Sequence, residues 1–336
     1  MDLRDWPVYP WQVGALVAAW QRRFADYLEV ESVEQYTRHK AHALTVTDSR
    51  APAESKVGHL FYVPHAHEPA GTAGCLSFVS QLLTGHHLDG APSTLARADI
   101  LSSAVLTFIP DANPYGRARC PEPFWEGRRY NNREFINMVF GIGDLHSSED
   151  LKPRWERYKR VVSFSTEEAA PARVGLVYEQ VGEHEYVEPG RYDERSSLVR
   201  LIRSLREKRE YRQVLSLHQT EFEDSPSDNC MLITPDALPR MPDARQQELL
   251  AWAEKVLAGW RMVGGRPSPL DDPLRPRDEE GLHRRQFGGL RAELQRESLY
   301  LVAEVQNNSP STPAEEQLLL VDAAIWSSVE HLLGTM

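Results

Sequence analysis

Four polar groups that could bind a metal ion or move a proton follow short apolar runs of this sequence. The groups are His65-Ala66-His67-Glu68, Asn113-Pro114-Tyr115-Gly116, His218 and Glu304. Each preceding run has the length and composition of a buried strand. The runs are Leu60 to Val63, Ala104 to Ile109, Gln213 to Leu217 and Leu299 to Ala303. Ligands of an open α/β sheet bind beyond the carboxyl ends of its strands, so we expect the four groups to converge on one site.

The residue types are those of a catalytic zinc site. Such a site takes three protein ligands from His, Glu or Asp and keeps a fourth position for water. His65 and Glu68, three apart in one loop, satisfy that count together with the distant His218. The metal lowers the pKa of bound water to about 7, and a nearby carboxylate can take the proton and pass it to a leaving nitrogen. Glu304 suits that base, because an unpaired buried carboxylate is otherwise costly.

Alternative interpretations remain for three of these residues. His67 alternates with His65 and is a rival ligand in a His-x-His arrangement, which would leave Glu68 without a role. Glu68 can also cap the helix that follows it, since carboxylates favour helix N-termini, and the two roles are compatible. His218 taken alone fits a core histidine equally well. We interpret the other histidines as solvated or structural, among them His59, His86, His87, His146, His184 and His283.

The order of these motifs resembles that of the zinc carboxypeptidase family. The matching elements are His65-x-x-Glu68, Asn113-Pro114-x-Gly116, Asn132-Arg133, His218, and Glu304 within Leu301 to Val305. The resemblance covers most of the chain. It implies one zinc ion on His65, Glu68 and His218, with Glu304 as general base and acid. It also implies that Asn132 and Arg133 hold the terminal carboxylate of the substrate, for which the planar guanidinium is suited.

The family further uses an arginine to stabilise the oxyanion of the tetrahedral intermediate. Arg117, Arg119 and Arg128 compete for that role in this sequence. Arg128 follows Trp125 and has the better spacing from Gly116, so we favour it, with Arg119 second.

The sequence departs from the family pattern at three places. Tyr130 stands where the family usually has an Asp that supports a zinc-bound histidine, and Tyr115 stands where Asp is common. Digestive members carry a mobile tyrosine before the glutamate, whereas no tyrosine occurs from Gln219 to Leu299. A second hypothesis is therefore an N-acyl amino acid deacylase that resembles aspartoacylases and uses the same ligands. A third is a catalytically silent binding protein on the same fold.

Bulk properties narrow the class of partner and the compartment. The 336 residues are 41% hydrophobic and carry a formal net charge of −11 without an acidic tail, which disfavours nucleic acid and anionic membranes. We expect a small peptide or acyl-amino-acid substrate, and the sequence does not predict the oligomeric state. The three cysteines are far apart and signal no disulfide framework. With no signal peptide and no run approaching the roughly 18 apolar residues of a membrane span, we expect a cytoplasmic protein.

The pattern of elements predicts one α/β domain over residues 1–336. Strands alternate with helices, which favours a mixed, mostly parallel twisted sheet with helices on both faces. The resemblance implies eight strands. We expect an N-terminal helix over residues 1–30 and a strand or hairpin over residues 31–48. Further helices are expected over residues 70–83, 191–208, 246–257 and 313–333.

Two charged segments stand apart from this alternation. Residues 144–190 are rich in charge and poor in pattern, and we interpret them as a surface insertion, with a lid as one form of it. Residues 282–291 carry Arg284, Arg285 and Arg291 shortly before the strand of Glu304. We interpret this second run as a solvated face, with a lid that binds an acidic group as the alternative.

Overall fold

The computed structural model describes residues 6–120, 174–189, 193–220, 229–235, 237–270, 290–307 and 312–334, and the backbone of residues 163–165. The strands are β1 (Leu28–Glu34), β2 (Lys40–Val46), β3 (Val57–Tyr62), β4 (Ala104–Ile109), β5 (Ser163–Ser165), β6 (Glu179–Gln180), β7 (Glu185–Val187), β8 (Gln213–Thr220), β9 (Cys230–Ile233) and β10 (Leu299–Gln306). The helices are α1 (Pro10–Arg23), α2 (Pro69–Thr84), α3 (Arg97–Ser103), α4 (Pro114–Ala118), α7 (Ser197–Lys208), α8 (Asp243–Met262), α9 (Leu290–Glu297) and α10 (Ala314–Gly334). Short 3-10 turns are η2 (Ala53–Ser55), η3 (Val174–Leu176) and η4 (Leu238–Arg240).

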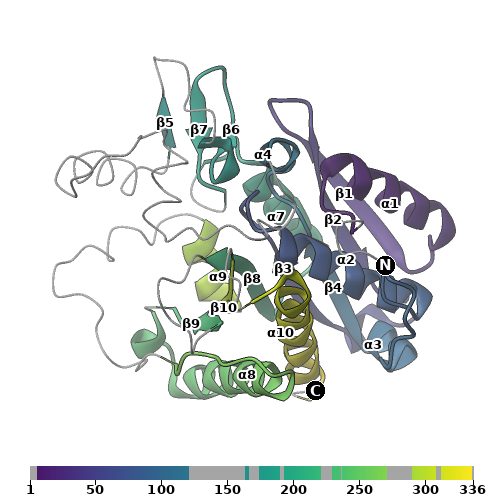
Figure 1. Ribbon diagram of the computed structural model, residues 1–336. Helices are drawn as coiled ribbons and strands as arrows, with labels where there is room; N and C mark the ends of the chain where they lie inside the picture. The colour runs from purple at the N-terminus through teal and green to yellow at the C-terminus, as the bar shows by residue number, and fades with distance from the viewer. Residues whose placement is uncertain are drawn as a thin grey trace.

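A mixed sheet forms the centre of the molecule (Figure 1). Among the described residues it has seven strands in the order β1-β2-β4-β3-β8-β10-β9. The four central strands, β4, β3, β8 and β10, run parallel, while β1, β2 and β9 join them through antiparallel pairs. This confirms the predicted α/β class. The resemblance implied eight strands, and the described part of the chain accounts for seven of them in this sheet.

Helices cover both faces of the sheet, as predicted (Figure 1). Helices α2, α8 and α10 pack on one face, in the larger apolar cluster. Helices α7 and α9 pack on the other, in a smaller cluster with alternate residues of the same strands. Strands covered on both sides must be apolar on both sides, which is why β3, β8 and β10 read as continuous apolar runs. No helix in the described part of the chain is long and apolar enough to cross a membrane.

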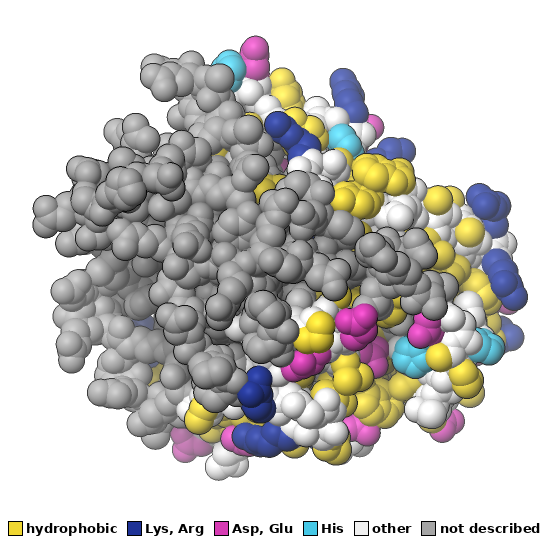
Figure 2. Space-filling model, viewed as in Figure 1, with side chains coloured by type: hydrophobic (Ala, Val, Ile, Leu, Met, Phe, Trp, Pro, Cys, Tyr) yellow, Lys and Arg dark blue, Asp and Glu magenta, His cyan; other side chains and the backbone are white. Residues whose placement is uncertain are grey.

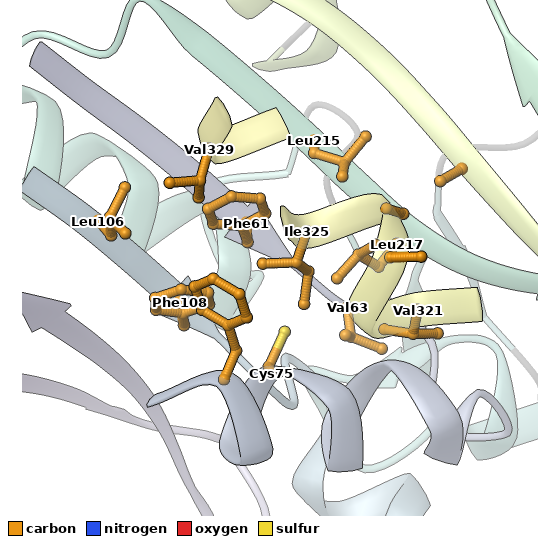
Figure 3. Packing of buried hydrophobic residues seen from close by; sticks show 14 of the residues in the cluster. Phe61, Val63, Cys75, Leu106, Phe108, Leu215, Leu217, Val321, Ile325 and Val329 are labelled. Atoms are coloured by element: carbon orange, nitrogen blue, oxygen red, sulfur yellow. The ribbon is translucent and has the colours of Figure 1, made fainter. Parts of the chain in front are cut away.

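The larger cluster is closely packed where β3, β4 and α10 meet (Figure 3). The rings of Phe61 and Phe108 stack with their centroids 4.8 Å apart, and both side chains are fully buried. Ile325 of α10 lies beside them. Helix α2 is buried along nearly its whole length, and a Cβ on Gly74 would come within 2.4 Å of a methyl group of Val321. The absence of that Cβ lets α2 approach α10 closely.

Two helices are shorter than predicted. The N-terminal helix ends at Arg23, and Leu28 already belongs to β1, so the last residues of the range 1–30 are strand. The helix expected from residue 191 begins at Ser197, where the buried carboxylate of Glu179 accepts hydrogen bonds from the Ser197 amide. That carboxylate fixes the helix start through tertiary contact, which no local pattern reveals.

The described part of the segment expected to be a surface insertion packs against the main domain. A small sheet, in the order β5-β7-β6, lies beside α4 (Figure 1). Val174 and Leu176 of η3 are buried, and the carbonyl of Leu176 accepts a hydrogen bond from the amide of Ala66 at 2.9 Å. Most of residues 144–190 lies outside the described residues, so the insertion and the single domain stay predictions.

Charged side chains are mixed across the described surface in the view of Figure 2. Lys and Arg groups stand singly or in small groups around this face, with Asp and Glu among them. This mixture accords with the net charge of −11 and offers nucleic acid no continuous basic stripe on the described part of this face.

The stacked pair Phe61 and Phe108 gives a test of the core. Replacing Phe61 with Ala removes a fully buried ring and leaves a cavity that the surrounding helices cannot fill, so the free energy of unfolding should fall by about 3–5 kcal/mol. Tyr36→Ala, at a side chain 54% exposed, is the control and should change the free energy of unfolding by less than about 0.5 kcal/mol. Urea unfolding followed by circular dichroism measures both. Equal losses would contradict the packing described.

Candidate metal centre

The loop after β3 holds the first two candidate ligands in a fixed shape. Val63 and Ala66 of this loop donate amide hydrogen bonds to Ile109 and Leu176, at 3.0 and 2.9 Å. Glu68 then stands at the N-cap of α2, with Pro69 in the first turn. Pro69 has no amide to satisfy and its ring favours helical φ, so the helix starts here by its own sequence. The loop is thus braced from two sides before any ligand is considered.

Glu68 lies between two histidines from distant parts of the chain. Its Oε1 atom is 2.8 Å from His65 Nδ1 and 3.3 Å from His218 Nδ1. The rings of His65 and His218 meet edge to face with centroids 4.9 Å apart. The side chain of Glu68 is 2% exposed, while those of His65 and His218 are 14% and 17% exposed. The cluster therefore opens to solvent on its histidine side and is closed behind the carboxylate.

The residues present fit a metal ion. Glu68 makes no side-chain capping bond with α2, although it occupies the N-cap position, so the capping role considered for it is not formed. Its second oxygen, Oε2, is buried without a hydrogen-bond partner among the described residues. Two imidazole nitrogens and one carboxylate are a donor set typical of zinc. A cation would compensate the otherwise unsatisfied carboxylate oxygen.

His67 lies in the same cluster. Ligand atoms of His65, His67 and Glu68 all lie within 4.8 Å of one another. His67 Nε2 is 3.8 Å from Glu68 Oε1, farther than His218 Nδ1, and its Nδ1 is 3.3 Å from the carbonyl oxygen of Leu176. Burial lowers the pKa of His67 to about 3, so its ring is neutral at physiological pH. Both His67 and His218 can thus be considered for the third ligand. The distance to Glu68 Oε1 favours His218, whereas His67, and not His218, belongs with His65 and Glu68 to the set whose ligand atoms all lie within 4.8 Å of one another.

The histidines and carboxylates of the cluster shift one another's pKa values towards the ionised forms. Burial would raise the pKa of Glu68, but the neighbouring His65 and His218 outweigh it and hold that pKa well below its ordinary value. For His218, burial would lower the pKa, and the carboxylates of Glu68 and Glu304 raise it. The carboxylate is therefore ionised at neutral pH, as a metal ligand must be.

Glu304 reaches the cluster through the register of two parallel strands. In β10 it pairs with His218 of β8, so both side chains leave the same face of the sheet. Burial raises the pKa of Glu304, and the charge of His218 opposes that shift. Its side chain is only partly buried. A carboxylate with a raised pKa beside a candidate metal ligand is suited to proton transfer.

The sequence motif Asn113 to Gly116 forms a turn that braces the site. Asn113 Oδ1 accepts the amide of Gly116 at 3.3 Å, and Nδ2 donates to the carbonyl of Gly175 at 2.7 Å. A Cβ on Gly116 would lie 2.0 Å from that same carbonyl oxygen. Asn113 thus ties α4 to η3, the turn that holds the ligand loop.

Of the other predicted residues, Arg119 is not brought into this cluster, whereas Arg117 lies near enough to His67 for its charge to help lower the pKa of that ring. Arg119 is exposed, and its guanidinium lies over the ring of Tyr115 and donates to the Tyr115 hydroxyl at 2.8 Å. Arg117 is fully buried, and its Nη2 donates to Thr72 Oγ1 in the first turn of α2 at 3.4 Å. Arg128, Asn132 and Arg133 lie outside the described residues.

Sequence reasoning missed a group of buried hydroxyls behind His218. Ser216 Oγ is 2.8 Å from His218 Nε2, and the hydroxyls of Tyr62 and Tyr300 are 2.8 Å apart. A serine two residues before a histidine in an apolar strand was the available signal, since both must point to one face. The two tyrosines could not be placed without the register of β3, β8 and β10.

Comparisons of sequence find no match for this chain, whereas comparison of structures finds proteins with the same fold. No model of a known protein family matches the chain, and no curated protein matches it in sequence.

Solved structures match over nearly the whole chain. Carboxypeptidase A from Helicoverpa armigera matches with a TM-score of 0.58 at 12% identity, over 97% of this chain and 73% of that one. Thrombin activatable fibrinolysis inhibitor matches with a TM-score of 0.56 at 14% identity, over 98% and 77%. A metallo-carboxypeptidase from Burkholderia cenocepacia matches with a TM-score of 0.54 at 12% identity, over 97% and 69%. Identities this low carry the fold alone, and the chain has the fold of the zinc carboxypeptidases.

Proposed function

We propose that this chain is a zinc-dependent hydrolase that cleaves an amide bond next to a free carboxylate, as carboxypeptidases do. The observation that carries the proposal is the convergence of His65 Nδ1 and His218 Nδ1 on one carboxylate oxygen of Glu68. His65 follows β3, and His218 lies near the end of β8, the parallel neighbour of β3. The two histidines are far apart in the sequence. Structural ion pairs rarely combine two imidazoles, a buried carboxylate and partial access to solvent, which together favour a metal site.

One zinc ion is the cofactor we propose, held by His65, Glu68 and His218. When bound in such a site, zinc polarises a carbonyl group and lowers the pKa of water to about 7. The residues around it would do the rest of the chemistry. Glu68 brings the negative charge that keeps a divalent cation in a largely buried site, and the partly exposed sides of His65 and His218 leave room for a substrate.

Glu304 is the proposed general base and acid. It sits beside His218 in strand register, so its carboxylate lies within reach of the same small volume. The carboxylate would accept a proton from the attacking water and later deliver it to the leaving nitrogen. A raised pKa favours the first step, because a more basic carboxylate takes the proton of water more readily.

Asn132 and Arg133 are proposed to bind the free carboxylate of the substrate, and Arg128 to stabilise the oxyanion. Arg119 is the weaker candidate for the oxyanion, because its guanidinium is engaged with the Tyr115 hydroxyl on the surface. A metallo-carboxypeptidase from Pseudomonas aeruginosa, with a TM-score of 0.52 to this chain, was solved in complex with (2-guanidinoethylmercapto)succinic acid. A small substrate with carboxyl groups is consistent with that likeness.

A deacylase of N-acyl amino acids is the second candidate, and one sequence feature favours it. No tyrosine occurs from Gln219 to Leu299, where digestive carboxypeptidases carry the mobile residue that covers a peptide substrate. The metal ligands and Glu304 would act in the same way on either substrate, since both present an amide next to a free carboxylate. The two candidates therefore differ in substrate and not in mechanism.

Metal content is the first test. The purified protein should bind about one equivalent of zinc, and zinc at one hundred times its dissociation constant should raise the free energy of unfolding by about 2.7 kcal/mol. Glu68→Gln should weaken zinc binding strongly, since it removes the buried negative charge. Glu254→Gln, on the exposed side of α8, is the matched control and should bind zinc like the wild type. Plasma mass spectrometry and thermal unfolding measure the two effects.

The identity of the third ligand is tested in the same assay. His218→Gln should lose zinc and His67→Gln should retain it, because His218 Nδ1 lies closer to Glu68 Oε1 than His67 Nε2 does. Less than about half an equivalent of zinc in the wild type, with no hydrolysis on adding the metal, would leave the silent binding protein as the better account.

Glu304→Gln tests the mechanism. The amide side chain keeps the volume but cannot accept the proton of water, so kcat should fall by about a hundred-fold or more while zinc content is unchanged. Initial rates on a cleaved substrate, with zinc measured in the same preparation, report both quantities. A variant that turns over at the wild-type rate would exclude Glu304 as the base.

A substrate panel separates the two candidate functions. The protein should prefer one of two substrate classes, either dipeptides and blocked dipeptides or N-acyl amino acids. The kcat/KM values of the two classes should differ by at least about ten-fold, since the site contacts the groups on both sides of the amide. Release of the free amino acid, followed by an amine-reactive dye, reports on both. Hydrolysis only of amides that lack a neighbouring carboxylate would contradict both candidates.

A further inference from the structure

The ring of His218 has a second nitrogen that the proposed metal site does not use. Nδ1 faces Glu68 Oε1 at 3.3 Å, and Nε2 faces Ser216 Oγ at 2.8 Å. A neutral imidazole carries one proton, and a nitrogen that bears it cannot bind a metal. Which of the two nitrogens is protonated therefore decides whether His218 can act as a ligand through Nδ1.

Ser216 belongs to a group of buried hydroxyls on three adjacent strands. Tyr62 of β3 pairs in register with Ser216 of β8, so both side chains lie on one face of the sheet, and the Ser216 hydroxyl opposes the rise in pKa that burial gives Tyr62. The Tyr62 hydroxyl lies 2.8 Å from that of Tyr300 on β10. Ser216 is fully buried, and the two tyrosines are 4% and 2% exposed. Around them lie Leu60, Val214 and Val302 of the smaller apolar cluster.

The apolar surroundings restrict how these hydroxyls can point. A buried hydroxyl that makes no hydrogen bond destabilises the protein by the full cost of its desolvation. Each hydroxyl of this group therefore needs a partner. With a metal ion on Nδ1 the ring proton stands on Nε2, and Ser216 Oγ, 2.8 Å away, is the acceptor in place for it. The hydroxyls of Tyr62 and Tyr300 satisfy one another at 2.8 Å. If Ser216 donated to Nε2 instead, the ring proton would stand on Nδ1 and would exclude a metal ion there. A Ser216 hydroxyl that accepts from Nε2–H is therefore the arrangement that suits a metal ligand.

We propose that Ser216, with the Tyr62–Tyr300 hydroxyl pair behind it, is a positioning residue for His218: it holds the ring proton on Nε2 and leaves Nδ1 open to a metal ion. This inference rests on the proposed function, because it assumes that His218 is a ligand. It does not extend to the other histidine ligand, since His65 bonds Glu68 from a loop and not from the sheet. Partners of this kind commonly contribute about ten- to a hundred-fold to metal affinity.

The test is zinc affinity measured by competition with a chromogenic chelator. Ser216→Ala should weaken zinc binding by about ten- to a hundred-fold, and Ser216→Thr, which keeps the hydroxyl, should restore most of it. Tyr62→Phe should weaken binding by a smaller factor, because Ser216 keeps its contact with the ring and loses only the neighbouring hydroxyl on β3. Tyr211→Phe is the matched control, since it removes a buried hydroxyl bonded to Thr107 of β4, which β3 separates from β8, and should leave the affinity unchanged.

A second readout does not depend on affinity or activity. In the zinc-loaded, ¹⁵N-labelled protein, the ring proton of His218 should be assigned to Nε2 and exchange slowly with water, and in Ser216→Ala it should exchange faster. Far-UV circular dichroism shows whether each variant is folded, and Ser216→Thr serves as the folded probe if Ser216→Ala is not.

The outcomes separate this inference from the proposed function. If the wild type binds zinc through His218 but Ser216→Ala and Tyr62→Phe bind it within two-fold of the wild type, the positioning role is wrong and the zinc site stands. A ring proton on Nδ1 in the zinc-loaded protein would also overturn the positioning role. If His218→Gln binds zinc as well as the wild type, the proposed ligand set fails, and this inference fails with it.

Discussion

The buried carboxylate of Glu68 is the constraint on which the rest of the structure depends. Removing a carboxylate from water costs several kcal/mol unless cations or hydrogen-bond donors surround it. Here two imidazoles face one oxygen, and the other has no partner among the described residues. Supplying those imidazoles requires β3 and β8 to lie side by side and parallel, so that His65 and His218 leave the same sheet edge. The fold therefore brings His65 and His218 to Glu68, and the two rings offset the cost of burying its carboxylate.

The two faces of the sheet have different roles, one in packing and one in the candidate site. The face under α2, α8 and α10 holds the larger apolar cluster and supplies packing, with a few buried polar side chains such as His59 and Gln213 among the apolar ones. The other face carries Tyr62, Ser216, His218 and Glu304 among aliphatic residues, because alternate side chains of parallel strands in register share one side. A single residue of register shift would move these groups into the larger apolar cluster. Site and core are thus specified by the same strand pairing.

Much of this arrangement could be predicted from sequence, and the limits have physical causes. His65 and Glu68 were predictable because they share one loop after an apolar strand. His218 and Glu304 were predictable because a polar side chain at the end of a buried strand is costly unless a partner or a ligand meets it. Contacts between residues far apart in sequence were not, such as Tyr62 with Tyr300. The orientation of Arg119 was equally hidden, since spacing does not tell which way an exposed arginine turns.

The central claim is that one zinc ion binds between His65, Glu68 and His218. Diffraction from crystals of the zinc-loaded protein, recorded on both sides of the zinc absorption edge, tests it directly. The account predicts one anomalous peak about 2.0–2.2 Å from His65 Nδ1, a Glu68 oxygen and His218 Nδ1. A peak held by His67 in place of His218, or no peak in crystals soaked with zinc, would contradict it.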